Sequence, residues 1–110
     1  MTTIVFNKHG MGDAPSELSH LLAKNYLKLI SEELERPTYI CFYAEGVKLT
    51  TEGSAVLEEL KKLESMGIHL LICKTCLGFY DLLDKVEVGT VATMMDIMGA
   101  QNTSSKVITL

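Results

Sequence analysis

The fold of this chain is decided by two short apolar segments, TYICFY at Thr38–Tyr43 and IHLLIC at Ile68–Cys73. Both are rich in residues that favour β-strands, and neither shows the alternation of apolar and polar residues that a half-solvated strand requires. Near-continuous apolar strands are typical of parallel sheets, because helices cover both faces of such sheets. The two segments therefore predict two central strands of a buried parallel sheet.

The sequence around these strands alternates between helical and extended patterns. Apolar residues at helical spacing predict a helix over residues 16–34; they are Leu18, Leu21, Leu22, Tyr26, Leu29 and Ile30. We expect Asp13 or Ser16 to cap this helix and Pro37 to stop it. Further helices are expected over residues 56–66, 75–83 and 90–98, further strands over 4–7, 86–88 and 106–110, and loops over 8–15 and 44–51. Alternating strands and helices predict an α/β fold, specifically a three-layer α/β/α sandwich with a parallel sheet.

Length and composition restrict the function classes. The 110 residues predict a single domain, residues 1–110, and 47% hydrophobic residues are enough for a globular core. The net charge is −4 and Arg36 is the single arginine, so we expect no nucleic-acid partner and no membrane partner. Residues 1–7 lack the pattern of a signal peptide, and three cysteines are an odd count. We therefore expect a cytoplasmic protein with reduced thiols.

The residues that could take part in chemistry lie where the predicted parallel strands end. Ligands of open α/β sheets bind at the carboxyl ends of the strands, which here are followed by residues 8–15, 44–51 and 73–76. Cys73-Lys74-Thr75-Cys76 ends one strand and opens a helix. Unpaired N–H groups at a helix start and a neighbouring Lys both favour the thiolate, which is the nucleophilic form of cysteine. This segment is therefore a candidate site for sulfur chemistry.

Several alternatives remain open for the cysteines and histidines. Cys73 and Cys76 also fit a purely structural pair, a thioredoxin-like redox motif, or half of a zinc site that would need further ligands such as His9. Cys41 lies mid-strand and is expected to act as a small buried hydrophobe. His20 and His69 are expected to be structural. The loop from Gly10 to Gly12 lacks the full spacing of a nucleotide-binding loop, but its N–H groups are suited to a small anion.

Three further segments carry a resemblance to a known family. They are FYAEGVKLT at Phe42–Thr50, CKTCLGFY at Cys73–Tyr80 and KVITL at Lys106–Leu110. With these segments in this order, the chain resembles the DsrE/DsrF/TusD group of sulfur-relay proteins. Within that group it is most similar to the DsrE-like C-terminal domain of YedF, a sulfurtransferase-like protein linked to selenium metabolism.

The resemblance implies a fold and a site. The fold would be a five-stranded parallel sheet of order 4-3-2-1-5, with Val86–Val88 as the fourth, edge strand. The chain would be a sulfurtransferase or sulfur carrier that needs no cofactor and no metal. Cys73 would accept sulfane sulfur, or selenium, as a persulfide, and Cys76 would be the second thiol. From the residues themselves, we expect the substrate-binding side chains and loop around the thiols to be Thr75, Lys74, Tyr43, Glu45, Gly46, His9 and Gly10, with Tyr80 as another hydrogen-bond donor.

The same resemblance predicts partners. We expect a homo-oligomer (a dimer, trimer or hexamer), because the family assembles and because Met94, Met95 and Met98 form an apolar ridge on a predicted helix. A TusA-like sulfur carrier would act on the chain in trans. The alternative function is a non-catalytic, oligomeric module that binds a small ligand or a metal.

Overall fold

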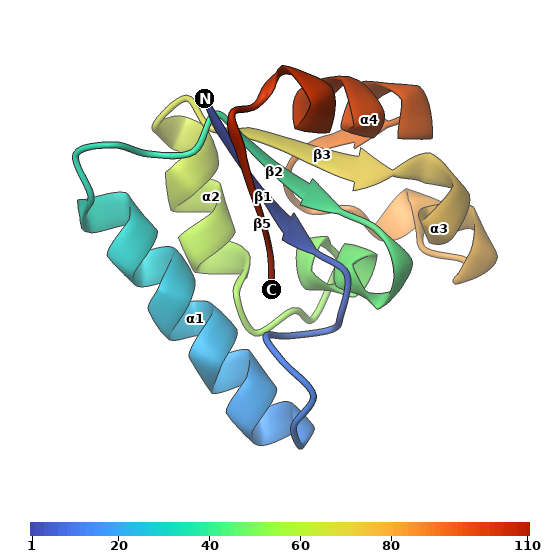
Figure 1. Cartoon of the computed structure of the whole chain (residues 1–110). Coiled ribbons are helices and arrows are strands. Elements are labelled where there is room, and N and C mark those ends of the chain that lie inside the picture. The colour runs from blue at the N-terminus through green and yellow to red at the C-terminus, as the bar shows by residue number, and fades with distance from the viewer.

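A parallel five-stranded sheet of order β4-β3-β2-β1-β5 forms the centre of the computed structural model, which describes residues 1–110 (Figure 1). The strands are β1 (Thr2–Phe6), β2 (Tyr39–Phe42), β3 (His69–Cys73), β4 (Thr90–Ala92) and β5 (Lys106–Thr109). The α-helices are α1 (Ser16–Glu32), α2 (Leu57–Ser65), α3 (Lys74–Phe79) and α4 (Met94–Thr103), and the 3-10 helices are η1 (Ala44–Thr50) and η2 (Leu83–Lys85). The expected sheet, its order and its flanking helices are confirmed, and the fold is the DsrE-like α/β fold.

The register of the sheet brings the carboxyl ends of the central strands together. Phe6 of β1 pairs with Phe42 of β2, and Phe42 pairs with Ile72 of β3. The rings of Phe6 and Phe42 stack at 5.7 Å between centroids. The chain therefore leaves β1, β2 and β3 at one edge of the sheet, immediately before the segments that hold the candidate site residues.

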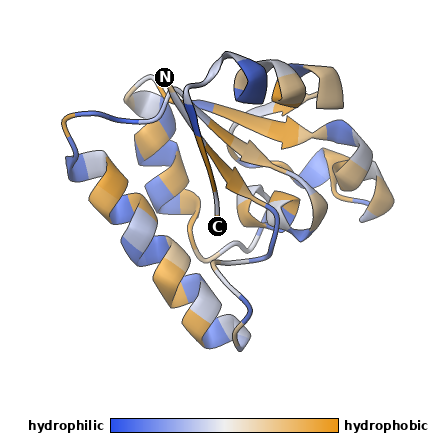
Figure 2. Cartoon of the chain, in the orientation of Figure 1, coloured by the Kyte–Doolittle hydropathy of each residue, from blue (hydrophilic) through white to orange (hydrophobic).

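Helices cover both faces of this sheet. Figure 1 shows α1 and α2 on one face and α4 on the other. Figure 2 shows the central strands as almost continuously hydrophobic, in agreement with a sheet that is buried on both sides. Buried residues on the helices complete the core, and they include Ala23, Leu27, Leu60, Leu63 and Ile97.

Helix α1 presents an apolar surface on the side that does not touch the sheet. Leu18, Leu21, Leu22 and Leu29 are all exposed, whereas Ser19, Ala23, Leu27 and Ile30 are buried. Helix α1 spans Ser16–Glu32, close to the expected 16–34, but most of the residues that predicted it face outward. Neither expected cap is used: Pro15 stands at the cap position without a side-chain hydrogen bond, and Asp13 pairs with Lys8 at 3.5 Å.

The prediction for the fourth strand is wrong. Val86–Val88 is not a strand; Val86 makes one isolated antiparallel bridge to Thr51, and the edge strand is β4, four residues later. Gly89, at φ +85°, turns the chain in between, and a Cβ there would lie 3.1 Å from the carbonyl oxygen of Leu70. This close approach to β3 needs a glycine, so the strand begins only after it.

Three other segments differ from the prediction. Helix α4 begins at Met94 instead of residue 90, because Thr93 and Asp96 form a reciprocal capping box. Residues 44–50 form the 3-10 helix η1 instead of a loop, with Gly46 N–H donating to the Tyr43 carbonyl at 2.9 Å. Helix α3 is shorter than expected and ends at Phe79, before Asp81 adopts φ +58°.

None of the helices has both the length and the apolar composition that a membrane-spanning helix needs.

Candidate functional site

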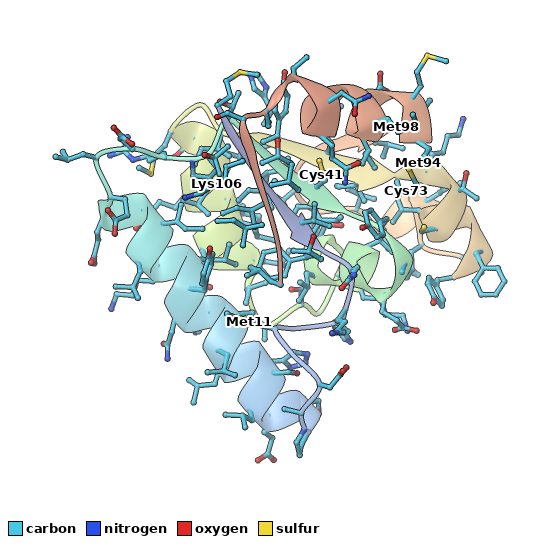
Figure 3. All side chains as sticks on the ribbon, viewed as in Figure 1. Met11, Cys41, Cys73, Met94, Met98 and Lys106 are labelled. Carbon is cyan, nitrogen blue, oxygen red and sulfur yellow. The ribbon has the colours of Figure 1, made fainter.

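Two thiols lie at the carboxyl end of the sheet. Cys73 is the last residue of β3 and the cap of α3, and Cys76 lies in the first turn of that helix. Figure 3 shows Cys73 at this edge and Cys41 within the sheet. Cys73 is only 1% exposed, whereas Cys76 is half-buried, and both are free thiols. The structure therefore places both thiols at the end of a central strand, as the sequence predicts, and Cys76 is the more accessible of the two.

The backbone of η1 contacts the more accessible thiol. The Ala44 N–H donates a hydrogen bond to Cys76 Sγ at 3.1 Å. Ala44 has φ +51°, a left-handed conformation that is uncommon for a residue with a Cβ and that costs of the order of 1 kcal/mol. Burial and the neighbouring Cys73 thiol raise the pKa of Cys76, and the Ala44 hydrogen bond acts in the opposite direction. The amide is therefore positioned to stabilise negative charge on this sulfur.

Three polar side chains form a connected cluster beside the thiols, which we call the Glu45 cluster. Tyr80 Oη donates to Glu45 Oε1 at 2.9 Å, and Lys48 Nζ lies 2.7 Å from Glu45 Oε2. Lys48 Nζ also lies 4.4 Å from the centroid of the Tyr80 ring. Hydrogen bonds from Lys48 and Tyr80 lower the pKa of Glu45, whose carboxylate in turn raises the pKa of Tyr80. Glu45 is thus an ionised acceptor that fixes the Tyr80 ring, which belongs to the turn after α3.

His9 lies between two hollows next to this cluster. One hollow of about 430 Å³ is lined by His9, Glu45 and Asp13, and another of about 310 Å³ by His9, Lys48 and Tyr80. Partial burial lowers the pKa of His9, as do the nearby His20 and Lys48. The imidazole is therefore neutral at physiological pH. Neither hollow is lined by Cys73 or Cys76, so the thiols lie outside both.

The other residues expected at the site make no hydrogen bond or ion pair with the thiols. Lys74 and Thr75 are exposed, and neither side chain makes an ion pair or hydrogen bond. Tyr43 is half-buried, without a partner for its hydroxyl group. Gly46 and Gly10 are buried against the backbone of Phe6 and against Ser19, so both contribute packing. No group of three or more His, Cys, Asp or Glu side chains is arranged to hold a metal ion.

Sequence reasoning missed Ala44 and Lys48 as members of the site. A 3-10 helix places residues three apart on one side, and this spacing joins Glu45 to Lys48. The spacing was visible in the sequence, but the segment was expected to be a loop. The Ala44 N–H and Cys76 are 32 residues apart, and only the packing of η1 against α3 brings them together.

Cys41 provides an internal test of thiol accessibility. Its side chain is fully buried, and burial raises its pKa to about 11. We expect iodoacetamide at about pH 8 to label Cys76 in the native protein and to leave Cys41 unlabelled until urea unfolds the chain. Peptide mass spectrometry after a timed quench separates the sites. Labelling of Cys41 as fast as Cys76 in the native protein would contradict the burial of β2.

Solved structures share the fold over almost the whole chain. The ychN protein from E. coli has a TM-score of 0.75 at 18% sequence identity, with 99% of this chain and 97% of that chain covered. A protein of unknown function, MTH1491 from Methanobacterium thermoautotrophicum, has a TM-score of 0.71, the same identity and the same coverage. At this level of identity the likeness establishes the fold. No protein-family model matches the chain.

A local sequence similarity links the chain to a different class of protein, but it covers only a small part of those proteins. Adenylosuccinate synthetases from Legionella pneumophila strains Lens and Philadelphia 1 are 35% identical to this chain over 71 residues. The match includes 58% of this chain, but the chain spans only 16% of the length of these curated relatives. The similarity therefore concerns one segment of those enzymes.

Proposed function

We propose that the chain is a sulfur-relay protein of the DsrE/DsrF/TusD group, which accepts sulfane sulfur as a persulfide on its Cys73–Cys76 pair. The observation that carries the proposal is the thiol pair at the carboxyl end of β3, with the Ala44 N–H directed at Cys76 Sγ. The DsrE-like fold supports it, as does the CKTCLGFY motif. The finer likeness to the YedF domain, and with it selenium as an alternative cargo, rests on the sequence motifs.

The geometry suits sulfur transfer for a chemical reason. A thiolate is the nucleophile that takes sulfane sulfur, and the resulting persulfide is also an anion. Backbone N–H groups fixed by packing stabilise such charge without reorganisation during the reaction. Free, reduced thiols also fit a cytoplasmic protein, which is the compartment we propose.

Cyanolysis tests the proposed function. Reduced protein is incubated with glutathione persulfide, separated from it on a desalting column, and treated with cyanide, which removes sulfane sulfur as thiocyanate. We expect the thiocyanate from the desalted protein and the hydrosulfide released before the column to sum to about one per chain, since one thiol of the pair is loaded at a time. Thiocyanate and hydrosulfide that both stay at the level of an iodoacetamide-blocked sample would overturn the proposal and favour a non-catalytic module that binds a small ligand in the hollows around His9.

We further propose that the chain works as a homo-oligomer (a dimer, trimer or hexamer) and receives sulfur from a TusA-like carrier in trans. Met94, Met95 and Met98 on α4 are 46%, 81% and 53% exposed, and Figure 3 shows Met94 and Met98 on this helix. The exposed leucines of α1 are a second apolar surface. Monomers seldom expose large apolar patches.

The expected result in light scattering at micromolar concentration is a mass of at least twice that of the 12.1 kDa chain. The variant Met95→Ser should weaken the assembly if α4 forms the contact. Lys61→Ser, an exposed change on α2, is the control and should leave the mass unchanged. A mass equal to one chain would contradict assembly.

A further inference from the structure

We propose that Cys76 is the thiol that takes sulfur from the donor, and that Cys73 then releases this sulfur as hydrosulfide by forming a Cys73–Cys76 disulfide. The inference rests on the proposed function and deepens it, because it reverses the roles that the family resemblance implies for the two thiols. It also assigns the chain a further activity, the reductive release of sulfane sulfur.

Accessibility decides which thiol meets the donor. Transfer requires the attacking sulfur to approach the donor's terminal sulfur along the axis of its S–S bond. Cys73 is 1% exposed and offers no such approach, whereas Cys76 is half-buried and lies on the surface of α3. The residues around Cys76 on this helix, Lys74, Thr75 and Phe79, are all exposed. A small persulfide therefore reaches Cys76 first.

The anion-stabilising contact belongs to the same thiol. The Ala44 N–H lies 3.1 Å from Cys76 Sγ, and the Cys73 thiol is a second neighbour of this sulfur. Ala44 holds this position at φ +51°, so the fold maintains an unfavourable backbone conformation where the amide faces the sulfur. No backbone N–H donates to Cys73 Sγ. The charge that develops during loading is therefore stabilised at Cys76.

Cys73 is placed to act second. It lies near enough to Cys76 for its thiol to raise the pKa of Cys76, and the two cysteines are three positions apart at the start of α3. Side chains at this spacing are neighbours on a helix, and a small adjustment allows a disulfide between them. Its burial protects it from the donor but leaves it facing Cys76. This is the position of a resolving thiol.

Both steps balance without a metal or cofactor. In the first, the Cys76 thiolate attacks the terminal sulfur of a persulfide donor; the donor's S–S bond breaks, a new S–S bond forms on Cys76, and the donor leaves as a thiolate. In the second, Cys73 attacks the inner sulfur of the Cys76 persulfide, and the terminal sulfur leaves as hydrosulfide with the proton of Cys73. The two thiols are oxidised to a disulfide and the sulfane sulfur is reduced by the same two electrons. A thiol reductant such as dithiothreitol then restores the pair.

The raised pKa of Cys76 adds a pH dependence. Loading requires the thiolate, and burial together with the neighbouring Cys73 raises the pKa of Cys76, so this thiol is mostly protonated at neutral pH. The loading rate should therefore increase by about tenfold per pH unit between roughly pH 6.5 and 8.5.

The test compares single variants loaded with glutathione persulfide. Lys74 lies between the two cysteines, so trypsin places Cys73 and Cys76 on separate peptides. We expect Cys73→Ser to keep one extra sulfur on the Cys76 peptide and to release at least about 10-fold less sulfide than the wild type. The wild type should release about one sulfide per chain and become two hydrogens lighter than its reduced form, with the two peptides joined. Cys76→Ser should not load. Cys41→Ala, the control, should behave as the wild type.

The outcomes separate the two proposals. If Cys76→Ser loads on Cys73 at the wild-type rate, or if Cys73→Ser releases sulfide at the wild-type rate, the roles assigned here are wrong and sulfur relay stands. If the folded wild type does not load at all, the proposed function itself fails. Because Cys73 is buried, Cys73→Ala is tested in parallel, and circular dichroism checks that each variant is folded.

Discussion

The variant Gly46→Ala should lose about 3 kcal/mol or more of its free energy of unfolding, or fail to fold. Gly46 is buried in η1, and a Cβ at this position would overlap the carbonyl oxygen of Phe6 and lie 2.7 Å from its carbonyl carbon. These are backbone atoms at the end of β1, and they cannot move without disturbing the pairing of β1 with β2. The loss follows from overlap alone, because Gly46 has no positive φ.

Urea denaturation measures this loss, and Gly99→Ala is its matched control. Gly99 lies inside α4, where a Cβ would meet no atom within 4 Å. Alanine favours a helix interior over glycine, so Gly99→Ala should leave stability unchanged or raise it by up to about 1 kcal/mol. If Gly46→Ala stayed within about 0.5 kcal/mol of the wild type, the close packing of η1 on β1, and with it the position of Ala44, would be wrong.

The double variant Cys73→Ser/Cys76→Ser should lose both thiocyanate formation and hydrosulfide release completely. Serine keeps the size of cysteine but cannot form a persulfide, and the remaining Cys41 is fully buried with a pKa raised to about 11. The control Cys41→Ala should retain the wild-type yield, although its smaller side chain lowers stability somewhat. A double variant that still yields about one thiocyanate per chain would move the sulfur chemistry away from the end of β3.

The sequence predicted the parts of the fold that local pattern determines. The apolar runs at residues 38–43 and 68–73 became β2 and β3, since only a strand covered on both faces accepts such composition. Val86–Val88 resembles a short edge strand because it holds two β-branched apolar residues, whereas Gly89 and the approach to Leu70 decide where pairing begins. Likewise, spacing predicted helix α1 but not its orientation, since its leucines face outward.

For the candidate site too, some features could be predicted from the sequence and others could not. The position of Cys73 and Cys76 at the end of a central strand followed from the sequence, because parallel strands end at one edge. Their unequal exposure did not, because it depends on how α3 and η1 pack over β3. The bond between Tyr80 and Glu45 spans 35 residues of sequence and required the folded chain. Long-range packing, and not the sequence motif, thus determines which of the two thiols is exposed to solvent.

Intact-mass spectrometry of the native, reduced chain after brief exposure to glutathione persulfide tests the central claim most directly. We expect a species heavier by one sulfur atom, about 32 Da, followed by a disulfide form as sulfide is released. Tryptic digestion of the same sample should place the added sulfur on the peptide that holds Cys76. Cys41 should carry no sulfur in the same sample, because it is fully buried. A native chain that gains no sulfur on either cysteine of the Cys73–Cys76 pair would contradict the account.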